Sequence, residues 1–382
     1  MLDRLDCIPW QCLHHAHGSA DDVPGLLRAL AQSGKQQEDA LRELFGNIWH
    51  QGTVYEASSY AVPFLVELAA KPGLTRRDEI LGLIGALAKG NSYLAVHAQP
   101  GLKMGEPLRQ EADFEERLEN ELQSVRITRR TVFEHRDVVC KLLKDTMPMV
   151  RAGAAHVLSQ FPEQLSELGF VLRLAVKEEK HPLVLAGMLW CLGALRDDSP
   201  EAFAILDTAV RGSADPRQTF AASIALYRIS GELHSAALPV YRQLAAATWF
   251  AESFLAGVPW DFSAEVPIEE LLATVEPDPA GATRTLLMLL NQAHAQEDSY
   301  PAVVHDLLQL NFTEGNWREC GQLTSTQKEV LRCVVETEDA WKDTRRLWFL
   351  IQDGARRISG LTPSDIQNVR DEMRALLGRT AI

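Results

Sequence analysis

The sequence predicts an all-α protein, a right-handed α-α superhelix in which helix pairs stack on one another as an α-solenoid. The first observation is a period, because Pro148, Pro182 and Pro216 recur at equal intervals of about 34 residues. The second is that apolar and small residues recur at the same interval, as a repeated structural unit requires. The matching positions are Leu158, Leu192 and Leu226; Phe161, Leu195 and Ile229; and Gly153, Gly187 and Ala221.

Each repeat unit contains two amphipathic stretches, which indicates two helices. Each proline opens the first of them, and proline is well placed in the first turn of a helix, where its missing N–H has no partner to lose. A pair of helices this short cannot bury its own apolar face, so neighbouring pairs must stack. The apolar stripes at helical spacing are Val150, Ala154, Val157, Leu158 and Phe161; Val184, Met188, Cys191, Leu192 and Leu195; Leu168, Val171, Leu172 and Ala175; and Ala202, Ile205, Leu206 and Ala209.

The stretch PMVRAGAAHVL, with Asp145 in the turn before it, resembles the second helix of HEAT repeats, including the HEAT-like units of phycobilisome lyases. The third copy departs from this pattern, with Gln218 and Thr219 where Val150 and Arg151 stand in the first. LHHAHG, LFGNIWHQGTVYEASSYAVPFLVEL and LTSTQKEVLRCVV resemble uncharacterised bacterial HEAT-repeat proteins. The resemblance implies a fold and carries little information on activity.

One solenoid is expected to span residues 1–382, and its parts differ in regularity. A capping box of Thr324 and Gln327 marks the start of a helix in the last part. In chain order we expect N-terminal helix pairs in 1–90, an irregular loop in 91–112, a charged helical segment in 113–144, regular repeats in 145–240, acidic and aromatic irregular repeats in 241–311, and a C-terminal helical cap in 312–382.

Charge and composition narrow the class of partner. The 382 residues carry a formal net charge of −14, and binding to DNA or RNA depends on Lys and Arg neutralising phosphates, so no nucleic-acid partner is expected. A basic protein is the complementary partner. No segment is apolar over a membrane-spanning length, and the six cysteines form no Cys-x-x-Cys pair, so we expect a cytoplasmic protein without membrane contact, metal or cofactor.

Three histidines near the N-terminus, His14, His15 and His17, precede Asp21 and Asp22, and such a group could ligate a metal. The spacing does not place the three imidazoles on one helix face, so a loop or helix-capping role is the stronger interpretation.

Residues 49–56 contain a second candidate site, formed by Trp49, His50, Tyr55 and Glu56. An imidazole, a phenol and a carboxylate this close in the chain could act as an acid–base set. The alternative is structural: Trp49 fills a gap between helix pairs, while His50 and Glu56 bind loop amides.

The main candidate site lies in residues 243–281, which contain seven acids and no Lys or Arg. Aromatic anchors rimmed by acids are typical of a surface that binds a basic protein, although the rings could equally fill the core of an irregular repeat. The predicted partner-binding residues are Trp249, Phe250, Glu252, Trp260, Asp261, Glu265, Glu269 and Glu270.

Function is therefore predicted as non-catalytic protein binding. No nucleophile elbow, Walker loop, dinucleotide fingerprint or His-Glu-x-x-His motif is present. The chain is expected to sequester a basic protein, in one version as a bacterial immunity protein that neutralises a toxin. A general assembly scaffold and a HEAT-fold enzyme, either a lyase or a protein like a DNA glycosylase, remain alternatives.

Overall fold

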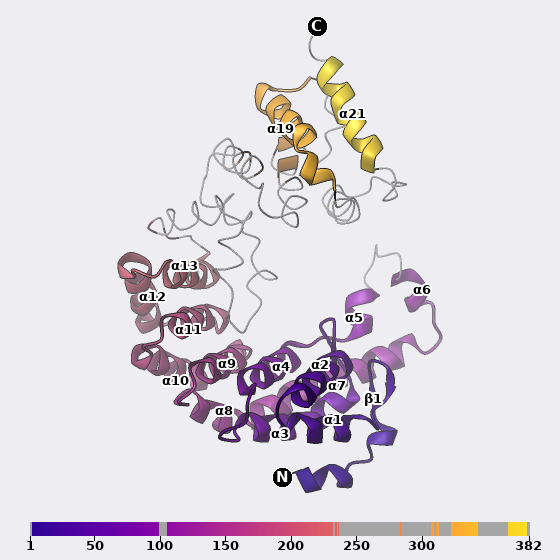
Figure 1. The fold of residues 1–382 in the computed structure, drawn as a ribbon, viewed down its shortest axis with the longest axis vertical. Coiled ribbons are helices and arrows are strands. Elements are labelled where there is room, and N and C mark those ends of the chain that lie inside the picture. The colour runs from indigo at the N-terminus through magenta and orange to yellow at the C-terminus, as the bar shows by residue number, and fades with distance from the viewer. Residues whose placement is uncertain are drawn as a thin grey trace. The chain divides into compact units, whose positions relative to one another are not determined.

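The computed structural model describes residues 2–98, 105–231, 322–342 and 366–379, together with a few isolated positions between residues 234 and 312. These residues are mostly helical, and many of the helices pack against one another (Figure 1). The chain divides into two compact units, an N-terminal one that holds Met1–Glu232 and a C-terminal one that holds most of the remaining residues. The predicted predominance of helix is thus confirmed.

The N-terminal unit begins with irregular structure and then proceeds by helices. Its described elements, in chain order, are η1 (Leu2–Cys7), η2 (Trp10–Cys12), β1 (His14–His15), β2 (Gly18–Ser19), α1 (Val23–Leu30), α2 (Lys35–Asn47), β3 (Trp49–His50), β4 (Thr53–Val54), α3 (Glu56–Ala69), α4 (Arg77–Lys89), α5 (Tyr93–His97), α6 (Gly105–Arg109), α7 (Phe114–Glu134), α8 (Arg136–Leu142), α9 (Pro148–Ser159), η3 (Pro162–Gln164), α10 (Leu165–Glu178), α11 (Pro182–Ala194), α12 (Pro200–Gly212) and α13 (Pro216–Ser230).

The three prolines of the period each begin a helix, α9, α11 and α13, as predicted. The turns before these helices repeat as well, because a polar side chain accepts the backbone N–H two residues further on. Asp145 Oδ1 accepts from Met147 at 2.9 Å, Glu179 Oε1 accepts from His181 at 2.7 Å, and Ser213 Oγ accepts from Asp215 at 3.1 Å. Asp145, Glu179 and Ser213 recur at the same interval as the prolines, so the period includes the turn chemistry.

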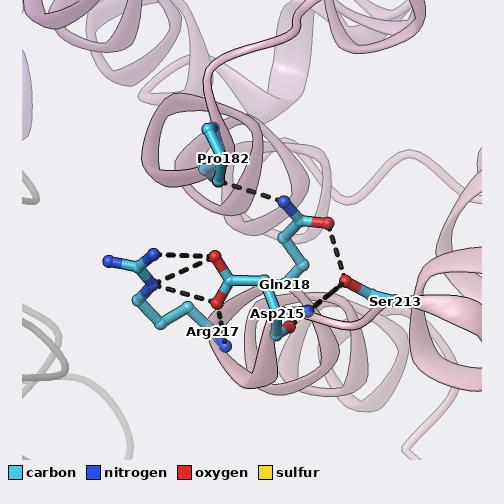
Figure 2. Close-up of polar contacts among 5 residues, drawn as sticks. All are labelled: Pro182, Ser213, Asp215, Arg217 and Gln218. Atoms are coloured by element: carbon cyan, nitrogen blue, oxygen red, sulfur yellow. Dashed lines mark hydrogen bonds and ion pairs between the residues drawn. The ribbon is translucent and has the colours of Figure 1, made fainter.

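Polar side chains in the first turns of these helices connect successive turns. Arg151 donates to Glu179 at 2.7 Å and to the Asp145 carbonyl at 2.9 Å. In the third copy, where the sequence departs from the pattern, Gln218 makes the connection instead (Figure 2). Its amide donates to the Pro182 carbonyl at 3.2 Å and accepts from Ser213 Oγ at 2.8 Å. The departure therefore keeps the cross-link between units while changing the side chain that makes it.

Packing follows the predicted apolar stripes. α4 packs against α9, α9 against α11, and α11 against α13, while α3, α8, α10 and α12 pack beside the helices that follow them. The five residues of the stripe on α11 are all buried, and so are Leu189 and Trp190 on its other sides, since α9, α10 and α13 all contact this helix.

Three segments differ in detail from the prediction. The turn between α2 and α3 is a hairpin of β3 and β4, paired Trp49 with Val54 and His50 with Thr53. A second hairpin, β1 with β2, stands in the entry segment. The loop expected in 91–112 contains two short helices, α5 and α6, with residues 99–104 outside the described part.

The C-terminal unit is described over α19 (Ser325–Glu336), η7 (Glu338–Trp341) and α21 (Ile366–Arg379). The predicted capping box is present, since the Thr324 N–H donates to Gln327 Oε1 at 2.9 Å and the Gln327 N–H donates to Thr324 Oγ1 at 3.2 Å. Trp341 is buried, and its indole N–H donates to the Val334 carbonyl at 2.8 Å.

Candidate functional site

The main predicted site lies outside the described residues. This applies to Trp249, Phe250, Glu252, Trp260, Asp261, Glu265, Glu269 and Glu270. The second predicted set is described in full and lies in the N-terminal unit.

A groove of about 1430 Å³ lies in the N-terminal unit, and two members of the second set, Tyr55 and Glu56, line it. We call it the α3–α7 groove, because those two helices supply most of its lining. The remaining lining comes from η1, Ile8, His14 and Val54. Its lining residues are Arg4, Cys7, Ile8, His14, Val54, Tyr55, Glu56, Ser59, Tyr60, Pro63, Phe64, Arg117, Asn120, Glu121, Gln123, Ser124, Ile127 and Thr131.

Trp49 and His50 form β3, the first strand of the hairpin, and their rings contact residues outside the groove lining. The Trp49 ring meets the Phe45 ring edge-on at 6.0 Å between centroids, and the His50 ring meets the His17 ring edge-on at 5.3 Å. Neither residue lines the α3–α7 groove. The four residues predicted as one set therefore occupy two surroundings, because the hairpin turns the chain between His50 and Tyr55.

The hairpin and the first turn of α3 fix Tyr55 at the end of the groove. Gln51 and Gly52 form the turn with φ values of 50° and 93°, the left-handed conformation that a two-residue hairpin requires. The Tyr55 N–H donates to Ser58 Oγ at 2.8 Å, and Ser58 Oγ donates to the Ile48 carbonyl at 2.6 Å. These bonds join the start of α3 to the end of α2.

The Tyr55 hydroxyl has a defined direction of hydrogen bonding. Thr53 Oγ1 gives its single proton to the His50 carbonyl at 2.7 Å. The 2.7 Å contact between Thr53 Oγ1 and the Tyr55 hydroxyl is therefore donated by Tyr55. Burial, and to a lesser degree the charge of Glu121, raise the pKa of Tyr55 above its ordinary value of 10.0. The phenol is consequently neutral at pH 7 and turns only acceptor lone pairs to a ligand.

α7 forms the second wall of the groove with one face of the helix. The lining residues between Arg117 and Thr131 follow helical spacing, and they span about 21 Å at 1.5 Å per residue. Glu121 joins this wall to α5, since its Oε2 accepts from Ser92 Oγ at 2.7 Å and from the Leu94 N–H at 2.8 Å. Both donors are neutral, so the Glu121 carboxylate keeps its negative charge.

The cations that line the groove are neutralised by acids outside its lining. Arg4 pairs with Glu67 and stands 5.7 Å from the Phe64 ring centroid, and Arg117 pairs with Glu111. The Glu56 carboxylate, by contrast, meets no Arg or Lys among the described residues; it lies 3.5 Å from the His14 imidazole, and its side chain is 52% exposed. The end of the groove near Tyr55 and Glu56 is therefore negative.

The histidines next to the groove have structural partners. His15 is buried and contacts Asp22 at 3.0 Å, while its other ring nitrogen accepts the His17 N–H at 3.0 Å. Asp22 also accepts from Asn47 at 2.6 Å. Asp22 does not cap α1 with its side chain; it fixes His15 instead. Among the described residues, no group of three or more His, Cys, Asp or Glu side chains is arranged to hold a metal ion.

Sequence reasoning missed the wall formed by α7, together with Arg4, Cys7, Ile8 and the aromatic residues Tyr60 and Phe64. One signal was available, because Pro63 stands inside a predicted helix, where it supplies no N–H and disturbs close packing. The pairing of α3 with α7 joins segments that are separated in the chain by three helices and their connections, and no local pattern indicates it.

Comparison with known proteins identifies no relative of this chain. No protein-family model matches the chain, and no curated protein shows significant similarity to it. In the part of the chain that the structure describes, none of the helices combines the length and the apolar character that crossing a bilayer requires.

Proposed function

We propose that this protein is a non-catalytic protein-binding α-solenoid and that its α3–α7 groove receives a segment of a basic partner protein. The single observation that carries the proposal is the size and composition of the groove. Its 1430 Å³ exceed the roughly 300–1,000 Å³ typical of small-molecule sites. Apolar and aromatic side chains such as Tyr60 and Phe64 share the lining with polar side chains of α3 and α7, a mixture expected of a protein-binding surface.

The solenoid part of this proposal extends the observed packing. Successive packing of α4, α9, α11 and α13, with the recurring turn chemistry, is what a right-handed superhelix of HEAT-like repeats would require. The resemblance of PMVRAGAAHVL to HEAT repeats supports the same arrangement.

The basic character of the partner is proposed from charge. The chain carries −14, and the groove retains negative carboxylates at Glu56 and Glu121. Opposite charge on a partner accelerates encounter and selects against acidic proteins. In its most concrete form, the protein is a cytoplasmic bacterial immunity protein whose client is a basic toxin.

Four of the ionisable groups that line the groove, those of Tyr55, Glu121, Arg4 and Arg117, favour binding over catalysis. The Tyr55 phenol gives its proton to Thr53, Glu121 is occupied in holding α5, and the cations are paired. A catalytic acid or base needs a proton that it can exchange with the substrate, and these groups are committed to structural partners.

Filling the groove tests the proposal. Ser124 lines the groove on α7, whereas Ser166 is an exposed serine on α10 outside it. Ser124→Arg should abolish binding of the native partner, and Ser166→Arg, which adds the same charge and bulk, should leave binding unchanged. The partner is first identified as a host protein retained by the native chain. Its binding to the purified native chain and to each variant is then measured by calorimetry.

The binding of the partner to the two variants decides whether the groove is the binding site. A saturable complex with a basic protein that weakens with salt and fails only with Ser124→Arg would support the proposal. Equal binding by both variants would refute the role of the groove. The immunity version further requires that co-expression of the native chain, and not of Ser124→Arg, rescues growth of cells producing the partner.

A further inference from the structure

Four hydroxyl groups that line the α3–α7 groove share a hydrogen-bonding direction. Ser59 Oγ donates to the Glu56 carbonyl at 3.3 Å, Ser124 Oγ donates to the Asn120 carbonyl at 3.1 Å, and Thr131 Oγ1 donates to the Ile127 carbonyl at 2.9 Å. The Tyr55 hydroxyl donates to Thr53, as shown above. A hydroxyl has one proton and two lone pairs, so each of these four groups can only accept a hydrogen bond from a ligand.

The backbone of α3 adds to this acceptor character. Pro63 has no N–H, so it gives no helical hydrogen bond to the carbonyl four residues earlier, that of Ser59. Both Ser59 and Pro63 line the groove. Other lining side chains bring donors: the amides of Asn120 and Gln123 can both donate and accept, and Arg4 and Arg117 donate to Glu67 and Glu111.

Acceptors and negative charge follow one another at the start of α3, and Glu121 of α7 acts on the first of them, Tyr55. We call Tyr55, Glu56, Ser59 and Glu121 the acceptor end. The first three residues belong to the N-cap and first turn of α3, and the Glu121 charge acts on the Tyr55 phenol. Glu56 and Glu121 are both carboxylates whose described contacts leave them without an Arg or Lys partner. A ligand that fills this end must therefore supply donors and positive charge.

We infer that the acceptor end binds an arginine side chain carried by an amphipathic helix of the partner protein. A guanidinium group offers five donors in a fixed planar fork and no acceptor, which matches the carboxylates and hydroxyl lone pairs that α3 and α7 supply. Tyr60, 43% exposed, lines the same groove together with Phe64 and Ile127. These side chains offer the apolar surface on which leucines of the same helix would pack.

The length of the groove agrees with a helical occupant. The α7 wall covers about 21 Å, the length of about 14 helical residues. A helix with apolar residues three and four positions apart presents one continuous stripe over such a distance. This inference rests on the proposed use of the groove for protein binding, and it specifies the chemistry of the partner.

The test uses synthetic peptides and the full-length protein. The probe is a fluorescein-labelled amphipathic peptide of about 15 residues, with a leucine stripe and one arginine, and its counterpart carries citrulline in place of arginine. Citrulline has nearly the same shape without the charge. Fluorescence anisotropy should show the arginine peptide binding about tenfold more tightly than the citrulline peptide, because the lost contacts are hydrogen bonds to charged groups.

Matched variants locate the contact. Glu56→Gln should weaken the arginine peptide about tenfold and leave the citrulline peptide almost unchanged. Glu43→Gln removes the same charge from an exposed position on α2 outside the groove and should change neither affinity. Because Glu56 is exposed, the variant should fold, and its thermal unfolding is recorded as a control.

The inference would be overturned if the two peptides bound with equal affinity, or if neither bound. It would also be overturned if Glu56→Gln and Glu43→Gln lost the same affinity for the arginine peptide. Its failure remains distinguishable from failure of the proposed function. If the peptides fail while Ser124→Arg still abolishes binding of the native partner, the groove binds a protein by other chemistry. If both experiments fail, neither statement holds.

Discussion

Gly193 on α11 is the position where a single methyl group should do most damage to helix packing. A Cβ atom added there would lie 2.4 Å from the Ala225 Cα and 2.7 Å from the Ala225 Cβ on α13. The neighbour at 2.4 Å is backbone, so no side-chain rotation relieves the clash. Gly193→Ala should therefore push α13 away from α11.

The size of the effect follows from that distance. Carbon atoms in contact lie about 3.5–4.0 Å apart, so the two helices must separate by more than about 1 Å. Overpacking of this kind costs about 1–3 kcal/mol, and the rigid contact places Gly193→Ala at the upper end. The higher helix propensity of alanine returns up to about 1 kcal/mol. We expect a net loss of about 2 kcal/mol, which corresponds to a melting temperature lower by about 4–8 °C.

Urea and thermal unfolding, followed by circular dichroism, measure this loss. The control is Gly82→Ala on α4, where an added Cβ would meet nothing within 4 Å, so stability should rise by about 0.5–1 kcal/mol. Ala225→Gly should restore little of the stability of Gly193→Ala in the double variant, because the Ala225 Cα, the atom nearest to the added methyl group, remains in place. The reasoning would be refuted if Gly193→Ala were as stable as Gly82→Ala, or if Ala225→Gly restored full stability.

Three further predictions concern polar groups in the N-terminal unit. The Arg77 side chain is 4% exposed and pairs with Asp145, so Arg77→Met should lower the free energy of unfolding, measured in urea, by about 3 kcal/mol. Arg211 belongs to an exposed ion pair, and Arg211→Met should lower it by less than about 0.5 kcal/mol. Burial, aided by Lys89, lowers the pKa of His156 from 6.5 to about 4. As the pH falls, the unfolded chain binds the proton before the folded chain does, so the free energy of unfolding should fall by about 2 kcal/mol from pH 7 to pH 5. His156→Leu should remove this pH dependence of the free energy of unfolding. Gln218→Ala should cost about 1–2 kcal/mol and accelerate amide hydrogen exchange at the start of α13, an effect whose absence would contradict the link in Figure 2.

The helices were predictable because their signals are local. A proline at the first position, an apolar stripe at helical spacing and the Thr324 capping box each concern residues within one or two turns, and all three agree with the structure. In the sequence, the use of Gln218 in place of Arg151 as the connecting side chain appeared only as a departure of the third copy from the repeat pattern. Its meaning depends on the Pro182 carbonyl, which belongs to a different helix.

The candidate site was predictable only in part. Trp49, His50, Tyr55 and Glu56 were predicted as one set, for their chemistry and their proximity in the chain. Tyr55 and Glu56 line the groove, whereas Trp49 and His50 do not. A hairpin of two-residue strands reverses the chain between them. Nearness in sequence therefore grouped side chains that the backbone separates.

By itself, the amino-acid sequence determined that this protein is helical, that its central units recur at a constant interval and that it is strongly acidic, since propensity, periodicity and charge are properties of the chain. Tertiary structure alone decided that the faces of α3 and α7 meet along a groove, and that side chains from η1, α3 and α7 share its lining. Those features arise from contacts between segments far apart in the sequence, and their geometry exists only once the helices have packed.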